Sequence, residues 1–252
     1  MSDGRVLAER NGNVGIIRLN RPEKLNAMTT AMLHDFISIA NTLERDPDVK
    51  AIVVCGEGKS FCAGRDLGEI QEFHGGDDEA VRAGMRPLAD VFGALRESQK
   101  VTVAVVQGNA MGFGCAVAAC TDLTVAEEGA VFAMAEARRG IATFGPLPVL
   151  LHVLPYKVLL EMVVTGDGLD AQRAYGIGLV NRIVKPGQGL AATLEWLGSF
   201  LVRDAGYVRD TKEAIRIVRN LPDRDAMRYL LDKATLHHIA GSAKQGIAEF
   251  VK

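Results

Sequence analysis

The chain has 252 residues, of which 48% are hydrophobic and 24% are charged, and its formal net charge is −2. These values are typical of one globular domain with at most a small additional part, and they give no electrostatic reason to expect a nucleic acid or an anionic membrane as partner. No apolar run reaches the roughly 18 residues of a membrane-spanning helix, and the first residues lack the apolar core of a signal peptide, so we expect a cytoplasmic protein.

The first part of the chain alternates between short strands and helices. Asn11-Gly12-Asn13 is typical of a hairpin turn between two strands. Apolar residues at helical spacing over residues 33–43 predict a helix, which Thr29 or Thr30 can cap. The predicted strands are 5–10, 14–20, 51–55, 101–107, 122–125 and 130–134, and the further helices are 67–73, 79–98 and 113–120. This alternation predicts an α/β domain with layered sheets.

From Gly145 onward the pattern becomes mainly helical. The predicted helices are 146–154, 156–164, 170–175, 189–202, 207–219, 224–239 and 243–251, and one strand is expected at 180–184. We therefore expect a core of residues 1–188 followed by a helical C-terminal region of residues 189–252, which is suited to contacts with other subunits.

Two glycine-containing turns, at residues 60–67 and 108–114, each follow a strand rich in β-branched residues and precede a helix. Backbone N–H groups at a helix start are unpaired and suit an oxyanion, so two such turns can direct two donors at one carbonyl oxygen. Dinucleotide binding is less favoured, because Val117 replaces the third glycine of a G-x-G-x-x-G pattern. A serine hydrolase would need a G-x-S-x-G motif, which the sequence lacks.

The cysteines and histidines do not form a metal-ligand or redox pattern. Cys55, Cys62, Cys115 and Cys120 lie among apolar or small residues without a C-x-x-C spacing, which predicts buried, reduced thiols. No basic partner is evident near Cys62, so we do not expect it to be a nucleophile. The histidines are scattered or adjacent: His34, His74, His152, His237 and His238.

Several of these stretches together resemble the enoyl-CoA hydratase/isomerase (crotonase) superfamily. The matching segments are 21–28 (RPEKLNAM), 60–67 (SFCAGRDL), 108–115, 165–167, 171–180 and 246–250, so the resemblance covers almost the entire chain. It implies an α/β fold of the ClpP/crotonase type, built from repeated ββα units with a helical C-terminal region. It also implies a homotrimer or a dimer of trimers, with residues 189–252 as the trimerisation region.

The resemblance further implies an acyl-CoA thioester as substrate, with coenzyme A as part of the substrate and with no metal or other cofactor. By position, the oxyanion would be held by the backbone N–H groups of Arg65 and Phe113. The residues expected to contact coenzyme A or substrate are Lys24, Ala27, Ala63, Gly64, Asp66, Leu67 and Gly112. Lys24 is also a candidate for a phosphate contact, Asp66 is suited to starting a helix, and the ring of Phe113 is expected at the acyl pocket.

The glutamates decide the reaction class. Hydratases resembling this chain use two glutamates, and here Ala116 replaces the first while Glu136 matches the second. One carboxylate beside the α-carbon suits a Δ3-Δ2-enoyl-CoA isomerase, with Glu136 as the catalytic residue that moves the proton. The alternatives are a hydratase with an atypical second acid/base, an inactive acyl-CoA-binding homologue, and a surface role for Glu136 in which it pairs with Arg138 or Arg139.

Overall fold

The computed structural model describes residues 5–73, 77–202 and 205–239. The chain divides into two compact units, residues 1–197 and 198–252. This division falls later than the expected boundary between residues 188 and 189, so helix α8 (Gly189–Gly198) lies in the first unit apart from its last residue. All of the predicted site residues belong to the first unit.

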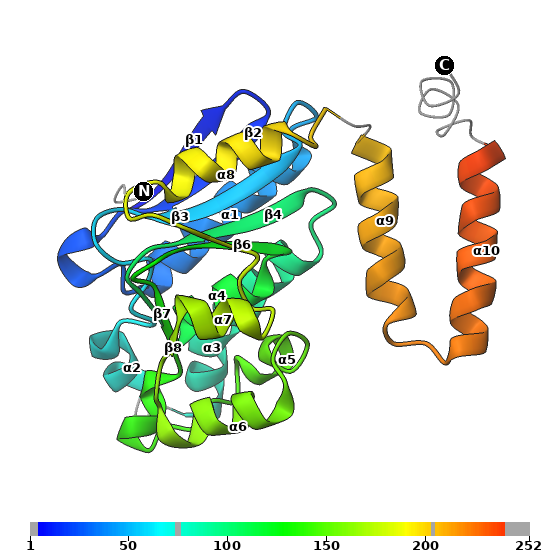
Figure 1. Ribbon diagram of the computed structural model, residues 1–252. Helices are drawn as coiled ribbons and strands as arrows, with labels where there is room; N and C mark the ends of the chain where they lie inside the picture. The colour runs from blue at the N-terminus through cyan, green and yellow to red at the C-terminus, as the bar shows by residue number, and fades with distance from the viewer. Residues whose placement is uncertain (1–4, 74–76, 203–204, 240–252) are drawn as a thin grey trace. The chain divides into compact units, whose positions relative to one another are not determined.

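The first unit is built on a six-stranded sheet with the order β1-β2-β3-β4-β6-β9 (Figure 1). The strands are β1 (Val6–Asn11), β2 (Val14–Leu19), β3 (Ala51–Gly56), β4 (Val101–Val106), β6 (Leu123–Glu127) and β9 (Arg182–Val184). The hairpin strand β1 is antiparallel to β2, and the remaining neighbours pair in parallel. Every residue of β3 and β4 is buried, as expected for central strands of a parallel sheet that is covered on both faces.

A second, three-stranded sheet is smaller and was only partly predicted. It consists of β5 (Asn109–Met111), β7 (Val131–Ala133) and β8 (Leu169–Asp170), and β7 is its middle strand. The sequence predicted only β7, because β5 lies within a glycine turn and β8 has two residues. Neither segment shows the alternation that marks a strand, and both are held in place by partners that are distant in sequence.

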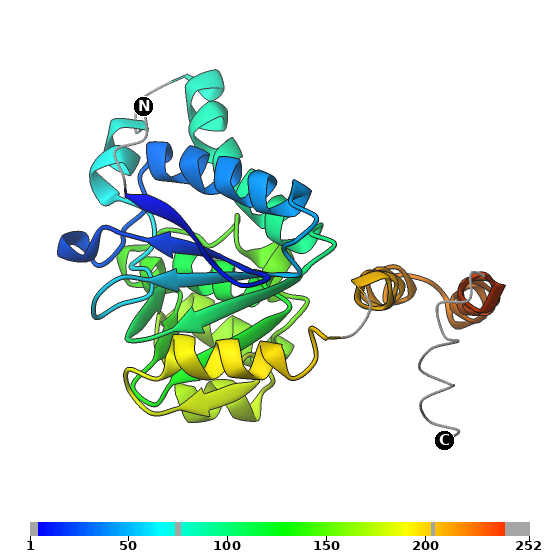
Figure 2. The same ribbon diagram turned by 90° about the horizontal axis from the view of Figure 1, so that it is seen from above.

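Helices cover both faces of the six-stranded sheet. Figure 2 shows α1, in blue, on one face and α8, in yellow, on the other. The helices of the first unit are α1 (Thr30–Arg45), α2 (Leu67–Phe73), α3 (Asp78–Arg96), α4 (Phe113–Cys120), α5 (Leu147–Leu150), α6 (Tyr156–Thr165), α7 (Ala171–Gly176) and α8. Thr29 caps α1 as predicted, with its side chain accepting from the N–H of Met32 at 3.2 Å. The predicted helix 146–154 was too long, since only its first part is α-helical.

The described part of the second unit is a helical hairpin, with α9 (Ala205–Val218) and α10 (Asp223–Ile239). The predicted helix 243–251 lies outside the described residues. No helix in the described ranges is both long enough and apolar enough to cross a membrane. Large apolar side chains are exposed on both helices of the hairpin: Tyr207, Ile215, Met227, Leu230, Leu231, Leu236 and Ile239.

Candidate active site

The two glycine turns are neighbours joined by backbone hydrogen bonds. The N–H of Cys62 donates to the Asn109 carbonyl at 3.0 Å, and the N–H of Met111 donates to the Cys62 carbonyl at 2.9 Å. Gly64 has a φ of +105°, and a Cβ placed on it would stand 3.1 Å from the Met111 carbonyl oxygen. The first turn therefore packs directly on the second, and both the backbone conformation and the contact favour glycine at position 64.

The same contact brings the two predicted oxyanion donors near each other. A Cβ on Gly64 would lie 3.9 Å from the nitrogen of Phe113, and the N–H of Arg65 follows Gly64 directly. Gly112, with a φ of +51°, precedes the first residue of α4. Among the described residues, neither Arg65 nor Phe113 donates its backbone N–H to a protein acceptor. Both amides thus remain available to a ligand.

Glu136 lies beside this pair of turns. It occupies the short 3-10 helix η2 (Ala135–Arg139), and its Oε2 is 2.9 Å from the point where a Cβ on Gly112 would stand. Its Oε1 accepts a hydrogen bond from the Thr143 hydroxyl at 3.3 Å. Burial raises the pKa of Glu136, and hydrogen bonds from its own backbone N–H and, to a smaller extent, from the Thr143 hydroxyl partly oppose this.

The expected alternative, in which Glu136 pairs with an arginine, does not match its surroundings. In the described part of the chain, no ion pair joins Glu136 to Arg138 or Arg139. Arg138 instead pairs with Asp167 at 3.0 Å, where both side chains are largely exposed. Glu136 is half-buried and faces the turn at Gly112, which is an unusual position for a solvated surface carboxylate.

Asp66 starts helix α2, as the sequence suggested. Its Oδ1 accepts from the Gly68 N–H at 2.9 Å, and its Oδ2 forms a 2.6 Å ion pair with Arg21. The Arg21 guanidinium holds the pKa of Asp66 below its usual value. Arg21 also donates to the Ala27 carbonyl at 2.9 Å, so this pair joins the loop of residues 21–28 to the first turn.

Replacing Asp66 by Asn should lower the free energy of unfolding by about 1 kcal/mol at neutral pH. Because the folded-state pKa of Asp66 is lowered, its stabilisation is present above the unfolded pKa of about 3.9 and is lost as the pH falls through the folded value. The difference between the two chains should therefore disappear in acid. Denaturant unfolding at pH 7 and in acid measures it, with Asp48→Asn as control, since the Asp48 side chain is 80% exposed and pairs with Arg10 only at 3.7 Å. An equal loss at both pH values would contradict the role of the ion pair.

Asn26 is a structural residue of this region that the sequence analysis did not single out. It is fully buried, and its φ of +57° lies in the left-handed region that asparagine tolerates. Its Oδ1 accepts from the Arg21 N–H at 2.8 Å, and its Nδ2 donates to the carbonyls of Glu57 and Ser60 at 2.9 and 2.8 Å. One side chain thus joins the loop of residues 21–28 to the segment that leads into the first glycine turn.

The Asn26→Asp variant should lose about 2–3 kcal/mol of unfolding free energy, because an aspartate turns an oxygen toward two buried carbonyls that now receive an N–H. Thermal and denaturant unfolding measure this loss. Asn41→Asp, on the exposed side of α1, is the matched control and should change stability by less than about 0.5 kcal/mol. Equal effects of the two changes would show that the hydrogen bonds of Asn26 do not stabilise the turn.

The other residues predicted to contact coenzyme A lie in the loop of residues 21–28 and in the first glycine turn, residues 60–67. The N–H of Ala63 donates to the Leu25 carbonyl at 2.9 Å, which holds the two segments side by side. Lys24 is exposed at the end of the 3-10 helix η1 (Pro22–Lys24), Ala27 and Ala63 are half-buried, and Leu67 is exposed at the start of α2. The ring of Phe113 is buried and stacks on Phe92 of α3, with ring centres 5.4 Å apart.

All four cysteines are buried free thiols. Burial raises the pKa of Cys55 to about 11 and those of Cys62, Cys115 and Cys120 to about 12. Such thiols are poor nucleophiles at neutral pH, which agrees with the interpretation of Cys62 from the sequence. Within the described ranges, no group of three or more His, Cys, Asp or Glu side chains is arranged to hold a metal ion.

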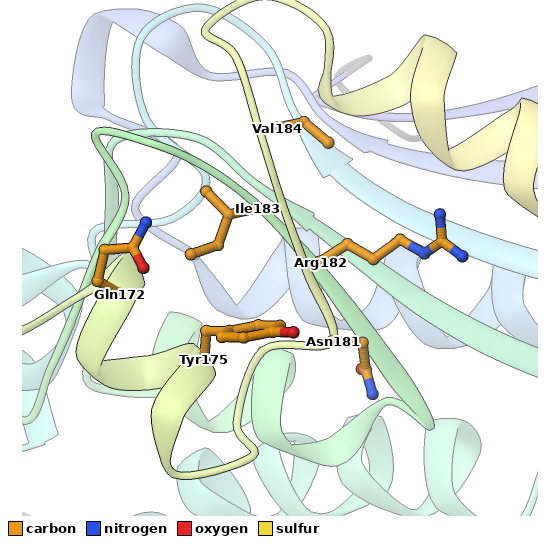
Figure 3. Close-up of a pocket in the computed structure, with 6 residues that line it drawn as sticks. All are labelled: Gln172, Tyr175, Asn181, Arg182, Ile183 and Val184. Atoms are coloured by element: carbon orange, nitrogen blue, oxygen red, sulfur yellow. The ribbon is translucent and has the colours of Figure 1, made fainter.

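Of two pockets in the described part of the chain, one lies away from the glycine turns and the other adjoins the second turn at Gly108. One, of about 410 Å³, is lined by Gln172 and Tyr175 of α7 and by residues 181–184, which include β9 (Figure 3). In this pocket Ile183 points toward α7, whereas Arg182 points to the other side of the strand, where its guanidinium lies 4.2 Å from the ring centre of Trp196. The other, of about 470 Å³, lies where β2, β3, β4 and β6 end. Neither pocket contains a predicted site residue.

Comparison with known proteins gives one consistent family. The family model described as enoyl-CoA hydratase/isomerase matches residues 9–252. A probable enoyl-CoA hydratase of Mycobacterium tuberculosis is 30% identical over 251 residues, which cover 98% of this chain and 95% of that protein. A short-chain-enoyl-CoA hydratase of Clostridium acetobutylicum is 31% identical over 218 residues, covering 85% of this chain and 82% of that protein. The crystal structure of an enoyl-CoA hydratase of Mycobacterium smegmatis superposes with a TM-score of 0.92 at 29% identity, covering 98% of this chain and 96% of that one.

Proposed function

The chain belongs to the enoyl-CoA hydratase/isomerase family, and from this premise we propose that it moves a proton within the acyl group of an unsaturated acyl-CoA, as a Δ3-Δ2-enoyl-CoA isomerase does. The observation that carries the proposal is the position of Glu136, a half-buried carboxylate beside Gly112 and the unpaired amide of Phe113. Ala116 stands where the family resemblance places the first glutamate of the hydratases, and alanine cannot transfer a proton.

In the proposed reaction, the N–H groups of Arg65 and Phe113 donate to the thioester oxygen of a 3-enoyl-CoA. Glu136 removes a proton from C2, which gives a dienolate with C1–C2 and C3–C4 double bonds and its negative charge on the thioester oxygen. Glu136 then returns the proton to C4, the C2–C3 double bond forms, and the thioester carbonyl is restored. Each oxyanion donor contributes about 3–4 kcal/mol in comparable sites, so a pair of donors makes the dienolate accessible.

The surroundings of Glu136 support a role in both halves of this transfer. An acid/base group works best when its pKa approaches the working pH, and burial raises the pKa of Glu136 in that direction. Ala116 is fully buried in α4, and its methyl group can neither accept nor donate a proton. The relatives bear the name hydratase, which makes hydration the main competing activity.

Coenzyme A is proposed to bind along the loop of residues 21–28 and the first glycine turn, residues 60–67, which the hydrogen bond from Ala63 to Leu25 joins. The pantetheine would pass Ala63, Asp66 and Leu67, and the adenine end would contact Ala27 and Lys24. Lys24 is exposed and free to reach a phosphate.

We also propose a homotrimer or a dimer of trimers, formed through the helical C-terminal region. Its support is the exposed apolar surface of α9 and α10, which includes Met227, Leu231 and Ile239. Native mass spectrometry of the full chain should give three or six times the chain mass of 27.0 kDa. A mass of one chain at micromolar concentration would contradict this assembly.

Mass spectrometry of the products formed from paired 2-enoyl- and 3-enoyl-CoA substrates tests the reaction. An unchanged mass with a moved double bond, detected by conjugation with the thioester, supports isomerisation. The gain of one water would instead establish a hydratase in which another group supplies the second proton function. Tight binding without turnover of either substrate would identify an acyl-CoA-binding protein and overturn the enzymatic proposal.

A further inference from the structure

Thr143 is a buried side chain in an otherwise exposed connection. It lies between η2 and α5, and it is 7% exposed, whereas its neighbour Phe144 is 78% exposed. Gly140, with a φ of +69°, turns the chain back at the end of η2, and the N–H of Ile141 then donates to the Glu136 carbonyl at 3.2 Å. The connection is thus folded onto the backbone of Glu136, and this places the hydroxyl of Thr143 at the carboxylate.

The Thr143 hydroxyl makes the two carboxylate oxygens of Glu136 different. It donates to Oε1 at 3.3 Å, whereas Oε2 lies closest to Gly112, 2.9 Å from the position of a Cβ there. Oε2 is therefore the oxygen that faces the turn carrying the Phe113 amide. A glutamate side chain has several rotatable bonds and loses this orientation when nothing holds it.

We propose that Thr143 is a positioning residue, whose hydroxyl holds Oε1 of Glu136 so that Oε2 stays directed at the reacting carbon of the acyl group. This inference rests on the proposed function, in which Glu136 carries the proton. The Thr143–Glu136 contact can nevertheless be tested without any reaction.

The charged side chains around η2 have other partners. Arg138, on the same element, pairs with Asp167 at 3.0 Å. Helix α6, which packs against η2, carries Glu161, and Glu161 pairs with Arg173. Among the residues that the structure describes, no charged side chain shifts the pKa of Glu136.

The hydrogen bonds that lower the pKa of Glu136 come from its own backbone N–H and, as the smaller contribution, from the Thr143 hydroxyl. The nearby thiol of Cys115, in α4, has a pKa of about 12 and is uncharged at neutral pH. Arg139, at the end of η2, is exposed. Since burial raises the pKa of Glu136 and the Thr143 hydroxyl lowers it, removal of the hydroxyl should raise that pKa further.

Two substitutions separate the hydroxyl from the shape of the side chain. Thr143→Val keeps the volume and removes the donor, whereas Thr143→Ser keeps the donor. In the full chain, on whichever acyl-CoA it turns over, Thr143→Val should lower kcat about 10- to 100-fold with KM within about threefold. The acid limb of its pH profile should move upward, because the base must lose its proton at a higher pH. Thr143→Ser should keep kcat and the acid limb of the pH profile close to those of the unmodified chain.

The pKa of Glu136 can be followed directly by NMR titration of side-chain carboxyls in the ligand-free protein, with Glu136→Gln used to assign the signal. A higher pKa in Thr143→Val, but not in Thr143→Ser, supports the inference. An unchanged pKa and kcat in Thr143→Val would overturn it, and so would equal impairment of the Val and Ser variants at equal thermal stability.

Loss of turnover in Glu136→Gln together with normal turnover in Thr143→Val would overturn this inference alone. Retained turnover in Glu136→Gln would instead overturn the proposed function, and the positioning role with it.

Discussion

The Glu136→Gln variant is expected to lose about 10²–10⁴-fold in turnover while it binds acyl-CoA almost as well as the unmodified chain. Glutamine has nearly the same shape and can keep the contact with Thr143, but it cannot accept the C2 proton. Steady-state kinetics and calorimetric binding of a saturated acyl-CoA measure the two quantities separately. For the unmodified chain, the acid limb of kcat should lie above the ordinary glutamate pKa of about 4.3, because burial raises the pKa of Glu136.

Glu128→Gln is the matched control. Glu128 is exposed in the connection between β6 and β7, so the same chemical change should leave kcat unaffected.

The thermal stability of Glu136→Gln is a second test, because the direction of its change can be predicted. A carboxyl whose folded pKa is raised destabilises the fold as the pH rises through that value, so Glu136→Gln should unfold at the same or a higher temperature than the unmodified chain at neutral pH. Full turnover in Glu136→Gln would show that another group moves the proton.

The second large effect is expected at Gly108, where an alanine should lower the free energy of unfolding by about 4 kcal/mol or more. Gly108 has a φ of +55°, and a Cβ there would stand 2.1 Å from the Lys59 carbonyl oxygen. Hydrogen bonds hold both backbone segments in place. The Gly108 carbonyl accepts from the Val131 N–H at 2.8 Å, and the N–H of Phe61, two residues after Lys59, donates to the Gln107 carbonyl at 2.8 Å. The clash would separate the two glycine turns from each other.

Gly12→Ala is a control with the same backbone conformation. Gly12 has a φ of +56° in the hairpin turn, but nothing lies within 4 Å of a Cβ there. Its substitution should therefore lower stability by about 1 kcal/mol, the effect of the left-handed conformation alone. Denaturant unfolding of both variants isolates the contribution of the backbone clash. If the two variants are equally stable, close packing at Gly108 does not maintain the site.

The elements with strong local patterns were predictable from the sequence. The apolar spacing of α1, the β-branched runs of β3 and β4, and the hairpin at Gly12 each arise from residues that are neighbours in the chain. The resemblance also identified the family that the comparisons establish. The short strands β5 and β8 were missed because they depend on pairing with distant segments.

The supporting contacts of the site could not be predicted in the same way. Glu136 and Gly112 carry signals in the sequence, whereas Thr143 reaches Glu136 only because Gly140 reverses the chain between them. Asn26 contacts residues more than 30 positions away, and no periodicity predicts such a contact. The sequence pattern thus marks the proposed site residues more clearly than the residues that support them.

Chemical labelling of the four buried thiols can measure how often the fold opens. A disulfide-exchange reagent reacts with a thiolate that it can reach, and in the closed fold Cys55, Cys62, Cys115 and Cys120 are neither accessible nor ionised at neutral pH. With excess reagent, the rate of labelling is therefore limited by how often the fold opens. Since the thiols lie on β3, before Gly64 and along α4, the order in which they are labelled would show which part of the sheet and its covering helix separates first. The same burial protects these four thiols from air oxidation for as long as the chain stays folded.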